Sequence, residues 1–201
     1  MISLITGGGG FIGSHLADKL VSLNHKVIVI DDFSVGRKKN LSQIKNKIKI
    51  VNSSILDKKK ISKYFKNVDN VFHLAAQADI VPSIENPNLY FDVNVKGTLN
   101  ILNHSVKNHV KRFIYIASSS SYGIPKKYPT PENSIIDPQY PYALTKRLGE
   151  ELVLHWADVY KIPALSLRFF NVYGTRSRTS GTYGAVFGVF LAQKLAGKPF
   201  T

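Results

Sequence analysis

The sequence predicts an α/β domain in which helices cover both faces of a parallel sheet, a doubly wound arrangement. Two observations support this prediction. Short apolar runs alternate along the chain with longer amphipathic stretches. The runs are apolar at nearly every position, as expected of strands that are buried on both faces. Parallel neighbours need crossover connections, and the amphipathic stretches supply them.

The expected elements follow in order. The strand-like runs are residues 2–6, 26–31, 47–51, 70–75, 112–118 and 164–170. The clearest helical stretches, which repeat apolar residues with a period of about 3.6, are residues 11–23, 89–106 and 142–160. Residues 123–141 are rich in proline and polar groups and form one long loop. Loops of this length inside compact domains are usually functional.

The bulk composition suits a folded domain. The chain has 201 residues, 44% of them hydrophobic, which is enough for a core. It contains no cysteine, so disulfides and thiolate chemistry are excluded. No apolar run approaches the ~18 residues that cross a bilayer. We therefore expect no membrane association and a cytoplasmic location.

Positive charge is concentrated in one segment. The formal net charge is +14, and residues 37–66 hold eleven of the 27 lysines and arginines with only Asp57 opposing them. A nucleic-acid surface is one interpretation. A solvated face is favoured, because the lysines show no aromatic interleaving of the kind used to stack bases, Tyr64 and Phe65 being adjacent to one another. Nucleic acid is therefore not the expected partner.

A glycine-rich turn follows the first strand in the stretch LITGGGGFIGSHL. Its four consecutive glycines leave two registers open, Gly8, Gly10 and Gly13 or Gly7, Gly10 and Gly13. In either register the backbone can approach a pyrophosphate closely, and the following helix offers free N–H groups and a positive dipole. The turn predicts a dinucleotide site in a Rossmann-type sheet.

Two carboxylates end the second strand, Asp31 and Asp32. Asp31 lies 18 residues after Gly13, close to the spacing at which a carboxylate accepts hydrogen bonds from an adenosine ribose. A 2′-phosphate would meet this negative charge, so NAD is favoured over NADP. Arg37 and Lys38 keep NADP open.

Tyr142 and Lys146 are four residues apart on an expected helix and therefore share a face. A tyrosine with a pKa of ~10 must lose about three pH units, or about 4 kcal/mol, to act as a base near neutrality. A cation ~6 Å away at an effective dielectric of ~20 supplies about 2.8 kcal/mol. Lysine alone is insufficient, and an oxidised nicotinamide would add the missing charge.

Taken together, five segments resemble the extended short-chain dehydrogenase/reductase family, and more narrowly its nucleotide-sugar epimerases and dehydratases. They are TGGGGFIG at 6–13, HLAA at 73–76, NVKGT at 94–98, the serines at 118–121, and Tyr142 with Lys146. The resemblance covers essentially the whole chain. It selects the register Gly7, Gly10 and Gly13 and implies that NAD is the cofactor, with no metal.

The resemblance also implies roles for particular residues. Tyr142 is the expected catalytic base, Lys146 is expected to hold the nicotinamide ribose and lower the pKa of the tyrosine, and Ser118 is expected to bridge the sugar O4 and the tyrosine. Ser119 or Ser120 are the alternatives to Ser118. The implied cofactor-binding residues are Gly7, Gly10, Phe11, Ile12, Gly13, Asp31, Asp32, Ile55, Leu74, Ala75, Ala76, Asn94, Tyr142 and Lys146. The implied substrate-binding residues are Ser118, Ser119, Tyr142 and Asn171.

One departure from the family pattern concerns the adenine contact. Relatives often carry an aspartate before an isoleucine, whereas this chain has Ser54 before Ile55. The reaction class rests on another departure. Dehydratases resemble one another in an acidic pair after the Ser118 position, and decarboxylating relatives commonly carry a glutamate there, but this chain has Ser119 and Ser120.

The resemblance therefore favours epimerisation at C4 of a nucleotide sugar, most simply a UDP-sugar, through a transient 4-keto intermediate. Two alternatives stay open. One is a nucleotide-sugar 4,6-dehydratase or decarboxylase. The other is a non-catalytic module that binds NAD and, through the basic segment 37–66, RNA.

Domain organisation and assembly complete the expectations. Residues 1–170 are expected to form the NAD-binding domain, and residues 171–201 the start of a substrate-binding lobe that is largely missing. In the family, the helices at 89–106 and 142–160 pair across a two-fold axis, which implies a homodimer. Packing of the same helices on the sheet is the alternative.

Overall fold

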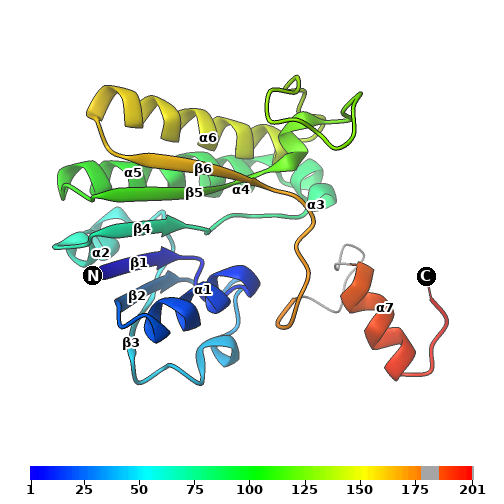
Figure 1. Ribbon diagram of the computed structural model, residues 1–201, viewed down its shortest axis with the longest axis horizontal. Helices are drawn as coiled ribbons and strands as arrows, with labels where there is room; N and C mark the ends of the chain where they lie inside the picture. Colours follow the sequence, from blue (N-terminus) through cyan, green and yellow to red (C-terminus); the bar gives the residue numbers. More distant parts are fainter. Residues whose placement is uncertain (178–185, 201) are drawn as a thin grey trace. The chain divides into compact units, whose positions relative to one another are not determined.

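The computed structural model describes residues 1–177 and 186–200. The chain divides into two compact units, Met1–Phe169 and Phe170–Thr201. The first unit contains a six-stranded parallel sheet with the order β3-β2-β1-β4-β5-β6 (Figure 1). The doubly wound parallel sheet predicted from the sequence is confirmed.

The strands follow the apolar runs closely. They are β1 (Ile2–Thr6), β2 (Lys26–Asp31), β3 (Ile48–Asn52), β4 (Asn70–His73), β5 (Arg112–Ser118) and β6 (Ala164–Phe169). The helices of this unit are α1 (Phe11–Ser22), α2 (Lys58–Ser62), α3 (Ile80–Glu85), α4 (Pro87–Phe91), α5 (Thr98–Lys107) and α6 (Pro141–Tyr160). Short helical turns are η1 (Lys38–Leu41), η2 (Lys63–Phe65), η3 (Asp92–Gly97) and η4 (Ser119–Tyr122).

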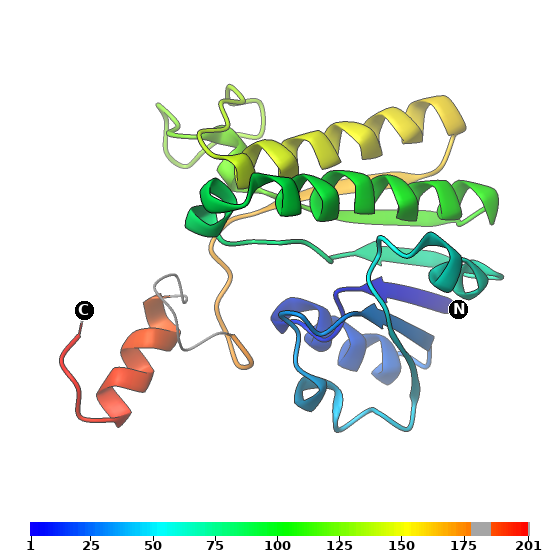
Figure 2. The ribbon, with the colours of Figure 1, turned by 180° about the vertical axis from the view of Figure 1, so that it is seen from behind.

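Alternate residues of β1, β2, β3 and β4 enter two separate cores. Leu4 of β1 joins a cluster with Ile101 of α5 and Val153 of α6. Its neighbour Ile5 joins a second cluster with Ala17 of α1. Figures 1 and 2 show α1 on one face of the sheet and α5 and α6 on the other. Because both faces are covered, the strands must be apolar at consecutive positions.

The central strand fixes the site. β1 pairs with β2 on one side, Thr6 facing Ile30, and with β4 on the other, Thr6 facing His73. The chain after β2 continues to β3, toward one edge of the sheet, and the chain after β4 continues to β5, toward the other edge. The loops at the carboxyl ends of β1, β2 and β4 therefore diverge. Ligands of open parallel sheets bind at such a divergence.

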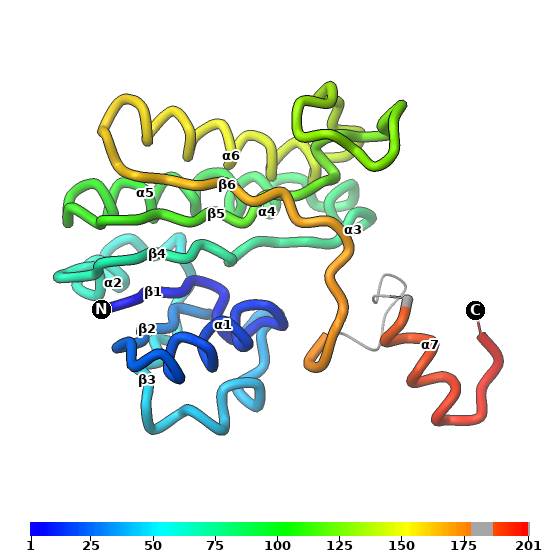
Figure 3. The backbone as a smooth tube through the Cα atoms, in the orientation of Figure 1, coloured from blue at the N-terminus to red at the C-terminus, as the bar shows by residue number. Residues whose placement is uncertain are grey.

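The helix expected at 89–106 is not a regular α-helix. It consists of α4, the π-helical turn η3 and α5, which follow one another in a continuous path (Figure 3). A π-helical turn accommodates an extra residue and turns the side chains that precede it relative to those that follow. The 3.6-residue period of apolar side chains does not reveal this interruption. Asn94 lies within the turn.

The other long helix, α6, begins at Pro141, where the missing N–H costs no hydrogen bond. It ends before Lys161, which adopts a left-handed conformation. The second unit contains α7 (Val186–Leu195). In the described part of the chain, none of the helices is long and apolar enough to cross a membrane.

Candidate functional site

The glycine turn between β1 and α1 is shaped by close backbone contacts. Gly7 has φ +72, a left-handed conformation, and a Cβ there would lie 2.7 Å from the backbone nitrogen of Ala75. At Gly13 a Cβ would strike the carbonyl oxygen of Gly7. Both positions therefore require glycine for packing within the protein. At Gly10 a Cβ would meet only the carbonyl of Gly7, at 3.2 Å.

The turn presents the start of α1 to the pocket. Gly10 precedes the helix, and within the described residues no side chain caps its N-terminus. The first N–H groups of an α-helix have no partner inside the helix, and together with the helix dipole they favour an anion. The anion site that the sequence predicts at this turn stays a prediction, and the uncapped helix start is consistent with it.

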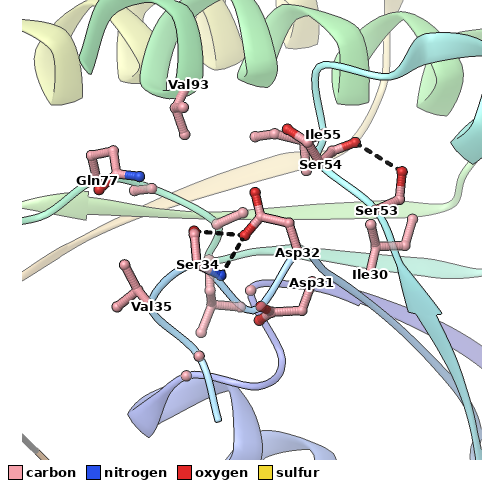
Figure 4. Close-up of a pocket in the computed structure, with 16 residues that line it drawn as sticks. Ile30, Asp31, Asp32, Ser34, Val35, Ser53, Ser54, Ile55, Gln77 and Val93 are labelled. Atoms are coloured by element: carbon pink, nitrogen blue, oxygen red, sulfur yellow. Dashed lines mark hydrogen bonds between the residues drawn. The ribbon is translucent and has the colours of Figure 1, made fainter. Parts of the chain in front are cut away.

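Asp31 holds the glycine turn in place. One carboxylate oxygen accepts a hydrogen bond from the backbone N–H of Gly9, and the other accepts one from Phe33, each at 2.8 Å. Burial raises the pKa of Asp31, these two hydrogen bonds oppose the rise, and the nearby charge of Asp32 adds to it. Asp32 is exposed and accepts hydrogen bonds from the backbone and hydroxyl of Ser34 (Figure 4).

A pocket opens at the carboxyl ends of β1, β2, β3 and β4 (Figure 4). Eight of the residues predicted to bind cofactor line it: Gly7, Gly10, Asp31, Asp32, Ile55, Leu74, Ala75 and Ala76. Phe11, Ile12 and Gly13 are not among the lining residues. Phe11 and Ile12 belong to the first turn of α1, and Gly13 packs against the carbonyl of Gly7. Ser54 lines the pocket next to Ile55, at the position where relatives often carry an aspartate.

Tyr142 lies in the first turn of α6, half-buried, with its ring edge-on to Tyr90 at 6.4 Å between centroids. Burial raises the pKa of Tyr142, the Ser118 side chain lowers it, and the charge of Asp79 raises it. Ser118 is therefore the serine whose side chain acts on the tyrosine. Its hydroxyl also lies 2.7 Å from that of Ser120.

Lys146 lies one helical turn after Tyr142 and is almost completely buried. Its ammonium donates a hydrogen bond to the carbonyl of Ile116 and lies 4.3 Å from the centre of the Tyr115 ring. Burial lowers the pKa of Lys146 to about 7, and the charge of Glu150 opposes this. The net effect of the protein on the pKa of Tyr142 is to raise it. The lower pKa expected of a catalytic base would therefore need the positive charge of a ligand.

Asn94 connects the pocket to α6, the helix of Tyr142 and Lys146. Its side chain exchanges hydrogen bonds with both backbone groups of Gln77, which lines the pocket. It also donates to the hydroxyl of Thr145 on α6. Asn94 is 1% exposed and lies outside the pocket lining. Its side chain therefore acts on the pocket through the backbone of Gln77.

His73 is a residue whose role the sequence did not reveal. Its two ring nitrogens lie 2.6 Å from the Thr6 hydroxyl and 2.9 Å from the Thr98 hydroxyl. Thr98 donates to the carbonyl of Asn94, so it accepts from His73 Nε2–H, and Nδ1 accepts from Thr6. Burial, followed by the charge of Lys146, lowers the pKa of His73 to about 3. A neutral imidazole thus joins β1 to the helix that carries Asn94.

A family model, described as the NAD dependent epimerase/dehydratase family, matches residues 3–201. The chain belongs to this family. The epimerase/dehydratase assignment agrees with the resemblance seen in the five sequence segments, and NAD is the cofactor of the family.

Relatives in the family carry different names. The chain is 36% identical to the UDP-N-acetyl-alpha-D-glucosaminuronate decarboxylase of Bacillus cytotoxicus, over 96% of this chain and 61% of that protein. The crystal structure of a UDP-glucose 4-epimerase from Thermotoga maritima, with UDP-glucose, matches with a TM-score of 0.93 and 37% identity. The Thermus thermophilus UDP-glucose 4-epimerase complex with NAD matches with a TM-score of 0.91 and 31% identity.

The matches cover most of this chain and less of the relatives. The two solved structures align with 98% and 99% of this chain but with 64% of their own chains. The chain therefore spans about two thirds of the length of these epimerase/dehydratase family members.

The residues of the pocket fit NAD. The glycine turn removes the side chains that would obstruct a pyrophosphate, the uncapped start of α1 faces it, and Asp31 supplies a carboxylate at the rim. Leu74 and Ile55 provide apolar walls. Asn171 belongs to the second unit and is exposed. Its expected contact with the substrate stays a prediction.

Proposed function

We propose that the protein catalyses NAD-dependent epimerisation at C4 of a nucleotide sugar, with a UDP-hexose, a UDP-N-acetylhexosamine or their uronic acids as substrates. One observation carries the proposal. The side chain of Ser118 acts on Tyr142, and Lys146 is buried one turn further along the same helix, in a fold with a pocket at its neighbouring strand ends.

The residues that would hold NAD are those of the pocket. Gly7 and Gly10 would admit the pyrophosphate, Asp31 would accept hydrogen bonds from the adenosine ribose, and Ile55 and Leu74 would pack on the rings. A 2′-phosphate would meet the carboxylates of Asp31 and Asp32, which supports NAD over NADP. When bound, NAD⁺ would accept a hydride from C4 of the sugar and return it, and its positive ring would lower the pKa of a nearby phenol.

The reactive side chains would handle the proton of the sugar. Tyr142 would remove the proton from the O4 hydroxyl, and Ser118 would hold O4 beside the tyrosine by a hydrogen bond of its own. The ammonium of Lys146 would stabilise the tyrosinate as it forms. Return of the proton from Tyr142 to O4 would complete the inversion at C4, after the keto sugar has turned its other face.

Epimerisation is favoured over dehydration by the turn η4. Its first residues, Ser119 and Ser120, occupy the positions where dehydratases carry an acidic pair. The Ser120 hydroxyl is already engaged with Ser118, at 2.7 Å. A hydroxyl is not an effective acid for moving protons at C5 and O6. The named decarboxylase among the relatives keeps that reaction as the second candidate.

The domain assignment is part of the proposal. Residues 1–170 would bind NAD, and residues 171–201 would begin the substrate-binding lobe, with Asn171 touching the phosphates of the nucleotide sugar. Sugar specificity would then reside largely beyond the residues that form the sheet.

A homodimer through α4, α5 and α6 is also proposed. Apolar side chains are exposed on α4 and α6, among them Leu89, Phe91, Leu144 and Leu154. Pairing with a second copy would cover them. Sedimentation of the protein tests this, because Leu144→Glu should convert a dimer to a monomer, whereas a monomeric unsubstituted protein would refute it.

The activity test mixes the purified full-length protein with NAD and a panel of UDP-sugars and identifies the products by NMR. The proposal expects a C4 epimer that Tyr142→Phe abolishes and that Tyr160→Phe, at an exposed position of the same helix, leaves unchanged. A protein that binds NAD but yields no C4 epimer would refute it. A 4-keto-6-deoxy sugar or released carbon dioxide would identify a dehydratase or a decarboxylase instead.

A further inference from the structure

Glu150 is a buried carboxylate on the reactive helix. It lies four residues after Lys146 on α6 and is 3% exposed. Three donors on three residues make four hydrogen bonds to its two oxygens. Arg168 Nε contacts both oxygens at 3.0 Å, the Ser166 hydroxyl contacts one at 2.9 Å, and Arg147 Nη1 contacts the other at 3.0 Å. A buried carboxylate persists as an ion only with such partners.

The partners on β6 are fixed from a second direction. Ser166 and Arg168 are two residues apart on the strand, so both project from the same face, toward α6. Arg168 also donates to the Tyr122 hydroxyl at 2.7 Å and to the carbonyl of Glu132 at 3.1 Å. Its guanidinium lies 4.9 Å from the centre of the Tyr122 ring. The position of Glu150 is therefore set by β6, η4 and the long loop together.

Apart from Glu150, the groups around Lys146 do little to stabilise its protonated amine. On β5 it meets the carbonyl of Ile116 and the face of Tyr115, and its charge acts on the neutral His73 of β4. On its own helix it has Tyr142 before it and Glu150 after it. Glu150 is the carboxylate whose charge acts on it.

We propose that Glu150, held by Arg168 and Ser166, is a positioning residue that keeps the buried amine of Lys146 protonated. The inference rests on the proposed function, because a charged Lys146 matters only where Tyr142 acts as a base. Glu150 would act through Lys146 and touch neither sugar nor cofactor.

The electrostatics agree with the geometry. Burial lowers the pKa of Lys146 to about 7, and Glu150 counteracts this effect. Without the carboxylate the pKa would fall further, and the amine would be neutral near pH 7. Removal of Arg168 should instead raise the pKa of Lys146, because the negative charge of Glu150 would then be less compensated.

The test measures the pKa of Lys146 directly by NMR of the protein with ¹⁵N-labelled lysine side chains, without sugar or NAD. Lys146→Met assigns the resonance. Glu150→Gln should lower the pKa of Lys146 by about one pH unit or more, and Arg168→Gln should raise it. Glu151→Gln is the matched control, because Glu151 is 54% exposed and pairs with the same Arg147. It should leave the pKa of Lys146 within a few tenths of a unit.

An unchanged or raised pKa of Lys146 in folded Glu150→Gln would overturn the proposal, because loosened packing admits water and moves the pKa up toward that of free lysine. If Glu150→Gln does not fold, Arg168→Gln decides, and an unchanged or lowered pKa there refutes the proposal. The activity test is separate. If the pKa of Lys146 falls in Glu150→Gln but the protein yields no C4 epimer, the inference is supported and the proposed function is rejected. If the protein yields the epimer but the pKa of Lys146 does not shift, the function is supported and the inference is rejected.

Discussion

The side-chain amide of Asn94 donates a hydrogen bond to the hydroxyl of Thr145, 3.0 Å away, across 51 residues of sequence. The same side chain accepts from the backbone N–H of Gln77 at 2.8 Å and donates to its carbonyl at 3.0 Å. Thr145 in turn donates to the carbonyl of Tyr142. One buried amide thus fixes the distance between the pocket wall and the start of α6.

Asn94→Asp should destabilise the protein by about 1–3 kcal/mol. The new carboxylate oxygen would face the carbonyl of Gln77 and the Thr145 oxygen, whose proton is already donated elsewhere. Asn103→Asp is the control, because Asn103 is exposed on α5 and its oxygen still accepts from Trp156. Urea denaturation measures the difference. Equal midpoints for the two variants would contradict the role of Asn94.

Gly10 and Gly13 should separate binding from folding. Gly10→Ala meets only one protein atom at 3.2 Å, so the fold should persist. Its methyl group would enter the pocket that Gly10 lines, so the Kd for NAD should rise at least about tenfold, a loss of about 1.4 kcal/mol. Gly13→Ala should instead lower the melting temperature, because its methyl group strikes the carbonyl of Gly7. Calorimetry with and without NAD distinguishes the two. Unchanged NAD affinity in Gly10→Ala would place the pyrophosphate elsewhere.

Acid should destabilise the protein through His73. The folded-state pKa is about 3, below the ~6.5 of an unfolded histidine, so the unfolded chain takes up a proton first as the pH falls. The stabilisation is present above pH ~6.5 and is progressively lost below it, by about 3 kcal/mol at pH ~4.5. His73→Gln should remove this part of the pH dependence of unfolding, and His155→Gln, at an exposed position, should not. Identical pH slopes in the unsubstituted protein and His73→Gln would refute the assignment.

Asp31 should matter more than Asp32 for NAD. Asp31→Asn leaves one oxygen for two backbone donors, those of Gly9 and Phe33, and should weaken NAD binding about tenfold or more by loosening the glycine turn. Asp32→Asn keeps the oxygen that accepts from Ser34 at an exposed position and should change the Kd less. Titration calorimetry compares the two variants. A larger loss in Asp32→Asn would show that the outer carboxylate holds the ribose.

Much of the fold could be predicted from the sequence. Strands buried on both faces must be apolar throughout, so the runs at 2–6, 26–31 and 112–118 coincide with β1, β2 and β5. The glycine turn and Asp31 could be singled out for a similar reason, since residue type and local spacing indicate them, and their contacts with the cofactor stay predictions. The expected helix at 89–106 was wrong in one respect, because apolar periodicity does not report the π-helical turn around Asn94.

The contacts between distant segments could not be predicted. Glu150 looks like an ordinary charged helix residue in the sequence, and nothing local indicates that it is buried against Arg168. His73 is a second example. It belongs to the HLAA segment, but its hydrogen-bond partners, Thr6 and Thr98, belong to other elements and cannot be identified from that segment. Which of the four serines meets Tyr142 also depends on the end of β5 and the start of α6 together.

Every strand pair in the sheet is parallel, and even the pair closest in sequence, β2 with β3, joins Val27 to Ile48. No hairpin can nucleate such a sheet, so each pairing must wait for a whole connecting segment to be synthesised and collapse. The pairing of Ser3 with Asn70 must wait longer still. The pocket is therefore complete only after β1 has paired with β4, the pairing with the largest sequence separation in the sheet, and a ligand bound there would stabilise that pairing against unfolding.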